Sequence, residues 1–252
     1  MAKSSLLISD RFISDNTDEI SSCIEEVKNW ILSQQKIDGH WAFELEADAT
    51  IPAEYIFLNH FLGEVNDDVE GKLANYLRGI QGEHGGWPLY HDGDFNLSAS
   101  VKAYFALKLA GESVDSPCMT RAKRIILDNG GAAHSNVFTR ITLALFEQVP
   151  WRATPLMRPE AMLLPKWAPF HISKISYWSR TVMVPLFIIA ALKPKAVNPK
   201  NINIRELFIS HENDDFEYMI NPTGHWLGSV ILLGDRLLQK VEKYFPKFLE
   251  QK

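Results

Sequence analysis

Apolar residues recur along the chain in runs that predict helices separated by short polar turns. One run begins at residue 52 and ends near Gly63, a second covers 101 to Gly111, and a third covers 138–146. Within the runs the apolar positions recur at the spacing of a helix rather than with the alternation of a strand. The pattern predicts an all-α protein.

A short motif precedes the first two runs. It consists of an aromatic residue, glutamine five positions later, glycine four positions further and tryptophan two positions after that. The two copies are displaced by 46 residues, and their defining residues are Gln35, Gly39 and Trp41, then Gln81, Gly85 and Trp87. A period of this length is typical of stacked helical hairpins. We therefore expect two repeats within 30–111 and a degenerate repeat over 120–151, which lacks the final tryptophan.

The motif residues are expected to have a structural role. A glutamine amide can bond backbone groups at the end of a neighbouring helix. A glycine suits the left-handed conformation near a helix C-terminus, and an indole behind it can cover the junction. Hairpins stack because none buries its apolar face alone. The expected fold is an incomplete α/α barrel-like toroid of helical hairpin repeats.

The remaining segments differ from the repeats in composition. An N-terminal arm (1–25) precedes the domain proper (26–252), and Pro185 is expected to kink any helix that contains it. The segments after the repeats are a connector (158–164), an apolar and aromatic-rich segment (165–192), a polar proline-containing loop (193–200) and an apolar terminal helix (225–245).

Composition excludes several classes of protein. The formal net charge is −5, which argues against a nucleic-acid partner. Cys23 and Cys118 lie far apart, and the histidines form no HxxxH or HExxH pattern, so we predict neither a disulfide scaffold nor a metal site. The longest apolar stretch, 182–192, is too short to span a bilayer. We expect a cytoplasmic protein that does not cross a membrane.

The doubled motif resembles the repeat signature of the squalene–hopene and oxidosqualene cyclases. The similarity runs from residue 30 to 192, and more loosely to 238, through the stretches 53–55, 101–108, 138–140, 150–151 and 177–182. It corresponds to about the first third of a full-length member. The resemblance implies two α/α barrel-like domains, squalene as substrate and no cofactor. It also implies an Asp-x-Asp-Asp acid in the other domain and aromatic faces that stabilise carbocations.

No Asp-x-Asp-Asp string occurs in this sequence, so we assign no catalytic residue and expect the chain alone to be inactive. The nearest string, residues 212–215 (Glu-Asn-Asp-Asp), lies in a hydrophilic stretch and is interpreted as a solvated loop. Residues 66–68 (Asn-Asp-Asp) are interpreted as a loop between repeats.

The resemblance also nominates substrate-binding residues. Trp178 matches a tryptophan that lines the family's cavity, and Ile175 and Met183 match positions in its substrate channel. Trp178 could instead be an ordinary packed tryptophan, and Ile175 and Met183 could equally be core residues. Glu54 and Arg140 could form a buried ion pair between repeats, while His84 and His91 are expected at the surface.

Two functions remain open from the sequence. The first is the N-terminal part of a squalene–hopene-type cyclase, with squalene or a related isoprenoid as ligand and a separate C-terminal half as partner. The helix at 225–245 would then contact the inner membrane peripherally, or pack on the second domain, and the exposed apolar wall could form a homodimer. The second is a non-catalytic isoprenoid-binding or interaction module, a remnant of a cyclase. A prenyltransferase β-subunit is also built from helical hairpins, but it requires zinc ligands, which this sequence does not show.

Overall fold

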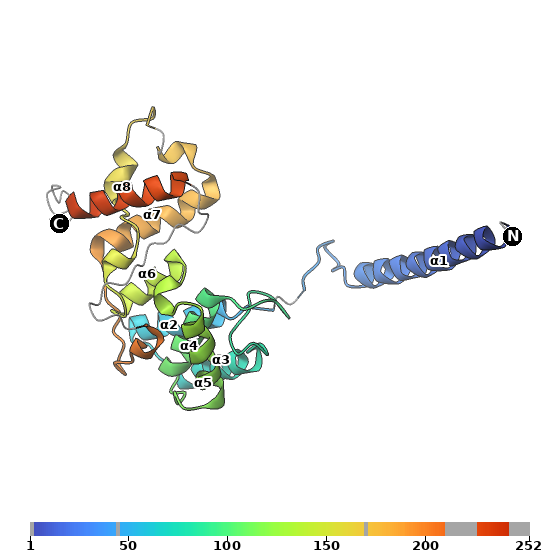
Figure 1. The fold of residues 1–252 in the computed structure, drawn as a ribbon, viewed down its shortest axis with the longest axis horizontal. Coiled ribbons are helices and arrows are strands. Elements are labelled where there is room, and N and C mark those ends of the chain that lie inside the picture. The colour runs from blue at the N-terminus through green and yellow to red at the C-terminus, as the bar shows by residue number, and fades with distance from the viewer. Residues whose placement is uncertain (1–2, 44–45, 169–170, 210–225, 242–252) are drawn as a thin grey trace. The chain divides into compact units, whose positions relative to one another are not determined.

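The structure is a computed structural model that describes residues 3–43, 46–168, 171–209 and 226–241. Among these residues there are helices and no strand, which confirms the all-α prediction (Figure 1). The α-helices are α1 (Lys3–Ser33), α2 (Thr50–Leu62), α3 (Asp67–Gly79), α4 (Leu97–Leu109), α5 (Pro117–Asp128), α6 (Val137–Leu145), α7 (Tyr177–Leu192) and α8 (Trp226–Val241). The 3₁₀ turns are η1 (Ala132–His134), η2 (Trp151–Ala153), η3 (Pro159–Leu163), η4 (Ile172–Lys174) and η5 (Arg205–Leu207).

The chain divides into two compact units, Met1–Glu46 and Ala47–Lys252. The first unit holds α1 and the first motif. The second holds every other helix. The boundary between the units follows residue 46, and the N-terminal arm over 1–25 stays a prediction.

Helix α4 is the centre of the second unit. It contacts α2, α3, α5 and α6, and Val101, Tyr104, Phe105 and Leu107 are fully buried. A helix that is apolar on every side must be enclosed by neighbours, and α4 satisfies this rule. Three phenylalanines fill the space between α2, α4 and the end of α6, with ring centroids 5.2–5.6 Å apart: Phe57, Phe105 and Phe146.

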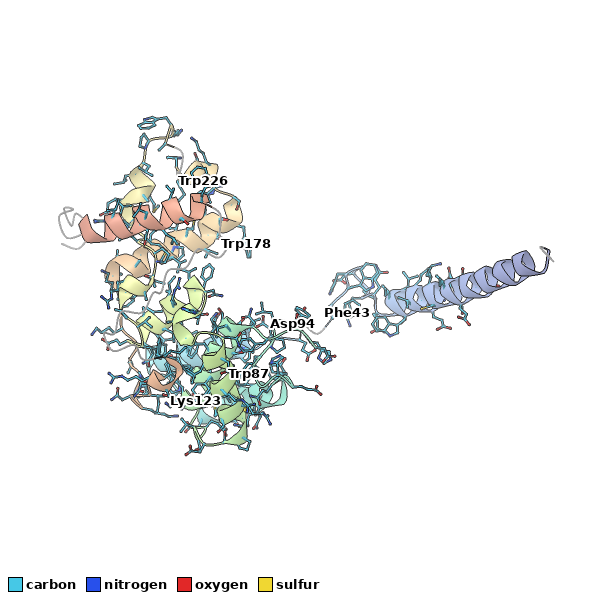
Figure 2. All side chains as sticks on the ribbon, viewed as in Figure 1. Phe43, Trp87, Asp94, Lys123, Trp178 and Trp226 are labelled. Atoms are coloured by element: carbon cyan, nitrogen blue, oxygen red, sulfur yellow. The ribbon has the colours of Figure 1, made fainter. Side chains whose placement is uncertain are left out.

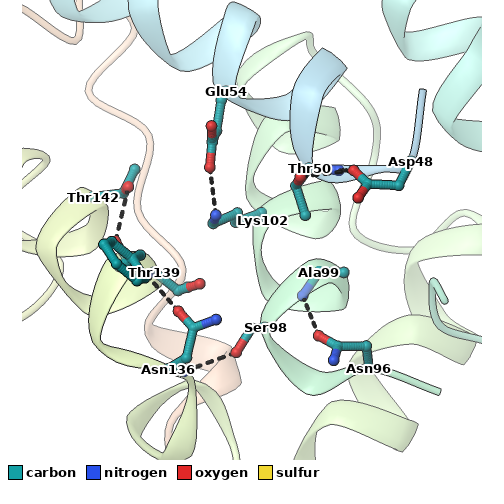
Figure 3. A network of polar contacts seen from close by, with 11 residues as sticks. Asp48, Thr50, Glu54, Asn96, Ser98, Ala99, Lys102, Asn136, Thr139 and Thr142 are labelled. Atoms are coloured by element: carbon teal, nitrogen blue, oxygen red, sulfur yellow. Dashed lines mark hydrogen bonds and ion pairs between the residues drawn. The ribbon is translucent and has the colours of Figure 1, made fainter. Parts of the chain in front are cut away.

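Asparagine and serine side chains begin most helices of this unit. Asn96 accepts the amide proton of Ala99 at 2.9 Å and Asn136 that of Thr139 at 2.9 Å (Figure 3). Asn66 likewise accepts from the second and third residues of α3. The expected loop at 66–68 is therefore wrong, because Asn66 caps α3 and the two aspartates form its first turn, where the helix dipole favours negative charge.

The polar loop after α7 holds the C-terminal ends of α2, α4 and α6. Its amides donate to the carbonyls of Leu145, Phe61 and His60 at 2.8–3.2 Å, from Ala196, Val197 and Asn198 respectively. The ammonium of Lys200 donates to the carbonyl of Leu109 at 3.0 Å. These carbonyls lie in last helical turns, which lack partners within the helix. The loop therefore brings the ends of three helices together.

Candidate functional site

The second motif links two helical hairpins. The Gln81 amide donates to the carbonyls of Gly85 at 2.7 Å and Cys118 at 2.9 Å, and its oxygen accepts from Arg121 at 2.6 Å. Cys118 and Arg121 belong to α5, so one side chain joins its own turn to the next hairpin. The glutamine meets a carbonyl in the first turn of α5 and the guanidinium of Arg121.

Trp87 closes the same turn. Its indole nitrogen donates to the carbonyl of Leu77 at 2.7 Å, in the last turn of α3, and the side chain is fully buried (Figure 2). Gly85 has a φ of +92°, a conformation that glycine adopts without strain. The three residues together seal the junction between α3, the turn and α5.

The first motif has the same internal bonds. Gln35 donates to the carbonyl of Gly39 at 2.7 Å, and Trp41 donates to the carbonyl of Ile31 at 2.8 Å. The offsets of four and ten residues equal those of the second motif. Gly39 has a φ of +88°. Trp41, however, is 43% exposed within its unit, so the local geometry repeats while the surroundings differ.

Helix α7 carries the nominated substrate-binding residues. Ser176 caps it by accepting the amide proton of Ser179 at 3.2 Å. Trp178, in the first turn, is 78% exposed, while Ile175 and Met183 are half-buried.

Trp178 does not stand alone on α7. The exposed apolar residues of the helix follow one another at intervals of three or four, along a single stripe: Trp178, Val182, Pro185, Ile188 and Leu192. Such a stripe is one face of a helix. The sequence predicted an apolar segment here. The structure shows that one apolar face of the helix is exposed.

Helix α8 has a second stripe. Trp226, Val230, Leu233 and Leu237 are 54–65% exposed, and their spacing of three or four residues places them on one face. Asp235, on the opposite side, accepts the amide proton of Leu156 at 2.9 Å. The helix is thus attached through its polar side and exposes its apolar side. The predicted helix at 225–245 is present over Trp226–Val241, and the other residues of that range except His225 follow it outside the described part of the chain.

Several ion pairs join α2, α3, α4 and the loop after α7, and none of them includes a residue of the two apolar stripes. Lys102 is buried and binds Glu54 (Figure 3). The pairing of Glu54 with Arg140 that the sequence suggested stays a prediction. His60 and Glu70 form a buried pair at 2.6 Å, and Lys200 reaches the second oxygen of Glu70 at 3.1 Å. These pairs join helices and loop, so their positions favour a structural role.

The residue Glu206 joins η5 to α4. Its carboxylate accepts from the hydroxyl of Tyr104 at 3.0 Å and binds the ammonium of Lys108. Burial alone would raise the pKa of Glu206, but the bonds from Lys108, the backbone and Tyr104 lower it on balance. The pKa of Tyr104 is raised, chiefly by burial. Sequence reasoning missed this cluster because its members lie about 100 residues apart.

The predicted surface histidines differ from one another. His91 is exposed, whereas His84 is half-buried and accepts the amide proton of Gly86 at 3.0 Å.

Within the described ranges no group of three His, Cys, Asp or Glu side chains is placed to hold a metal ion. The Glu-Asn-Asp-Asp string at 212–215 lies outside those ranges. Of the helices that the structure describes, none is long and apolar enough to cross a membrane.

A family profile described as the squalene–hopene cyclase N-terminal domain matches residues 24–252. The chain belongs to this family. The resemblance predicted from the doubled motif is thereby confirmed.

Squalene–hopene cyclases from several bacteria are similar to the chain. That of Bradyrhizobium diazoefficiens is 54% identical over 237 residues, which cover 92% of this chain and 36% of the relative. That of Zymomonas mobilis is 50% identical, with 94% and 36% covered, and that of Alicyclobacillus acidocaldarius is 37% identical over 185 residues, with 73% and 29% covered. The chain therefore spans about a third of the length of the curated relatives it matches.

Proposed function

We propose that this chain supplies one wall of the substrate cavity of a squalene–hopene-type cyclase, which closes squalene into a pentacyclic product. The observation that carries the proposal is the uncovered apolar stripe of α7, headed by Trp178 at 78% exposure. A neutral C30 hydrocarbon offers no hydrogen-bonding group. Its recognition requires an extended apolar and aromatic surface of this kind.

Each nominated residue has a role in this proposal. The indole face of Trp178 holds the folded hydrocarbon and stabilises positive charge, since a cation is attracted to the ring quadrupole. Ile175 and Met183, on either side along the chain, line the channel through which squalene enters. The general acid that protonates the alkene comes from a separate part that carries Asp-x-Asp-Asp, because this sequence contains no such string.

A peripheral membrane contact belongs to the same proposal. Squalene dissolves in the bilayer, and the exposed stripe of α8 has the one-sided apolar face of an interfacial helix. The contact would be with the cytoplasmic side of the inner membrane. A second copy of the chain, or the second cyclase domain, would cover the same stripe if the membrane does not.

The proposal is tested by reconstitution. The chain is assayed for squalene turnover in detergent, alone and mixed with the C-terminal part of the Bradyrhizobium relative, with products identified by gas chromatography. Hopene is expected only in the mixture. Turnover by the chain alone would overturn the requirement for a second part, whereas squalene binding without product in the mixture would favour a non-catalytic isoprenoid-binding module.

Variants in the active mixture test the cavity wall. Trp178→Leu is expected to lower the rate of hopene formation about tenfold or more, because an aliphatic side chain lacks the ring quadrupole. Trp178→Phe should retain most of the activity. Tyr90→Leu is the control, since Tyr90 is 68% exposed outside the stripe. Equal losses in all three variants would contradict the role of Trp178.

A further inference from the structure

Basic residues are concentrated in one part of this acidic chain. Residues 152–200 contain eight Lys or Arg and a single acidic residue, Glu160, which leaves 18 basic and 30 acidic residues elsewhere. Some of these cations are bound within the chain. Arg158 pairs with Glu160, Lys195 with Glu147 and Lys200 with Glu70. Arg152 and Lys193 also have partners, which leaves fewer cations available to an outside ligand.

Lys166 and Lys174 are two of these available cations. Both are exposed. The ammonium of Lys174 donates to the carbonyls of Trp167 at 3.3 Å and Ala168 at 2.9 Å. Neutral carbonyls leave its charge uncompensated, and Lys166 meets no carboxylate within the described ranges. Two positive charges thus lie on one turn of the chain, since Lys174 binds the backbone beside Lys166.

Large exposed apolar side chains lie on both sides of Lys166 in the chain. Leu163 is 80% exposed and Trp167 is 81% exposed, with Met162 and Leu164 exposed beside them. The turn η3 that carries Leu163 contacts α7, so the side chains project from an anchored turn. We call Met162, Leu163, Leu164, Lys166, Trp167 and Lys174 the basic–aromatic patch. Its composition is typical of segments at the membrane interface, where indoles lie at headgroup level and lysines extend to the phosphates.

We propose that the basic–aromatic patch inserts into the interface of a bilayer that contains anionic phospholipid. Leu163 and Trp167 enter the acyl boundary, and Lys166 and Lys174 meet the lipid phosphates. The inference rests on the peripheral membrane contact proposed above and adds its lipid chemistry: α8 supplies apolar attachment, and the patch supplies selectivity for anionic headgroups.

A bilayer fits this patch better than a protein surface does. The core of a protein interface is depleted of lysine, because burial strips water from the ammonium group. The headgroup layer keeps the ammonium hydrated while it attracts the cation. A second copy of the chain would have to desolvate both lysines beside Trp167.

The test is co-sedimentation of the whole chain with vesicles of phosphatidylcholine alone or mixed with phosphatidylglycerol. We expect tighter binding to the mixed vesicles, weakened by salt through screening. The double variant Lys166→Gln with Lys174→Gln should bind the mixed vesicles on the order of tenfold more weakly, with little change on phosphatidylcholine. The matched control is Lys36→Gln with Lys72→Gln, which removes two exposed lysines outside the patch.

Further variants separate this inference from the proposal on which it rests. Leu233→Asp with Leu237→Asp in α8 should weaken binding to both vesicle types, and Trp167→Ser should do the same. If the α8 variant abolishes binding while the patch variants bind like the wild type, the patch inference is overturned and the membrane contact stands. Absence of binding to either vesicle overturns both. Loss of association with the C-terminal part in the lysine variant, without loss of vesicle binding, would assign the patch to a protein partner and overturn the lipid assignment.

Discussion

The indole nitrogen of Trp87 donates a hydrogen bond to the carbonyl of Leu77 at 2.7 Å, where both side chains are fully buried. The same bond joins Trp41 to Ile31 at 2.8 Å, although Trp41 is 43% exposed. One local geometry therefore exists in two environments. The pair allows the contribution of burial to be separated from that of the bond.

Trp87→Phe is expected to lower the free energy of unfolding by about 2–3 kcal/mol, since it strands a buried carbonyl and leaves a void. Trp41→Phe should cost less than about 1 kcal/mol, because water can replace the lost donor. Urea denaturation followed by circular dichroism measures both. Equal losses of unfolding free energy in the two variants would show that burial of Trp87 does not increase the contribution of its hydrogen bond.

The contact between Lys200 and Glu70 supports a second prediction. Glu70 shares a buried site with His60, and Lys200 binds its second oxygen at 3.1 Å while it also bonds the end of α4. Lys200→Met should destabilise the fold by roughly 1–2 kcal/mol. This is less than the loss of a fully buried ion pair, because the lysine is 40% exposed.

Lys72→Met is the control for this variant. Its pair with Asp68 lies on the surface of α3, with both side chains 74% exposed. Such a pair contributes less than about 0.5 kcal/mol. A loss in the Lys200 variant no larger than in this control would mean that the loop does not stabilise the helix ends.

Glu206 gives the stability of the fold a dependence on pH. Its pKa in the folded state is lowered by its bonds with Lys108, the backbone and Tyr104, despite the opposing effect of burial. The stabilisation is therefore present above the unfolded pKa of about 4.3 and is lost as the pH falls through the lower, folded value. Glu206→Gln should flatten the acid limb of a stability curve measured by urea titration between pH 3 and 7. An unchanged slope would contradict this assignment.

The two cysteines should differ in reactivity. Burial raises the pKa of the Cys118 thiol, whereas Cys23 is exposed on α1. At pH 8 a disulfide reagent such as DTNB should modify Cys23 on the order of tenfold faster or more, since the thiolate is the reacting species and must be accessible. Cys118→Ser should leave only the fast phase and Cys23→Ser only the slow one. In urea the two rates should converge, and a persistent difference there would exclude folding as its cause.

Local patterns in the sequence predicted much of this fold. Helical spacing located α2, α4 and α6, and the paired motifs placed Gly39 and Gly85 where the backbone turns left-handed. These features depend on neighbours within a few residues, and a sequence reports such neighbours directly.

Partners distant in the chain could not be predicted in this way. Glu54 binds Lys102, 48 residues away, and a charge pattern alone does not choose between Lys102 and Arg140. The proline-containing loop at 193–200 has the composition of solvated chain, yet its amides reach helix ends up to 138 residues distant. Spacing places Trp178 on an apolar face of α7, but it does not reveal what covers that face, so its contact with substrate stays a prediction.

Gly111 and Gly131 both have a positive φ, but only Gly131 also lies close to another part of the backbone. Alanine substitutions at the two positions therefore distinguish the cost of backbone strain from the cost of a steric clash. Gly111 has a φ of +92° with no atom within 4 Å of the position of a Cβ, whereas at Gly131, with a φ of +75°, a Cβ would lie 2.7 Å from the carbonyl oxygen of Leu207. Gly111→Ala should therefore cost about 1 kcal/mol from the left-handed conformation alone.

Gly131→Ala should cost more, by a further 1–3 kcal/mol or so, because the added methyl pushes against backbone of the η5 turn. That displacement should also disturb Glu206, which belongs to the same turn. Urea denaturation at pH 7 and at pH 4 measures both effects: in the Gly131 variant the difference between the two pH values should shrink, while in the Gly111 variant it should match the wild type. If both variants lose the same free energy of unfolding and show the same difference between pH 7 and pH 4, the η5 turn accommodates the added methyl group. The close approach at Gly131 would then not contribute to the stability of the fold.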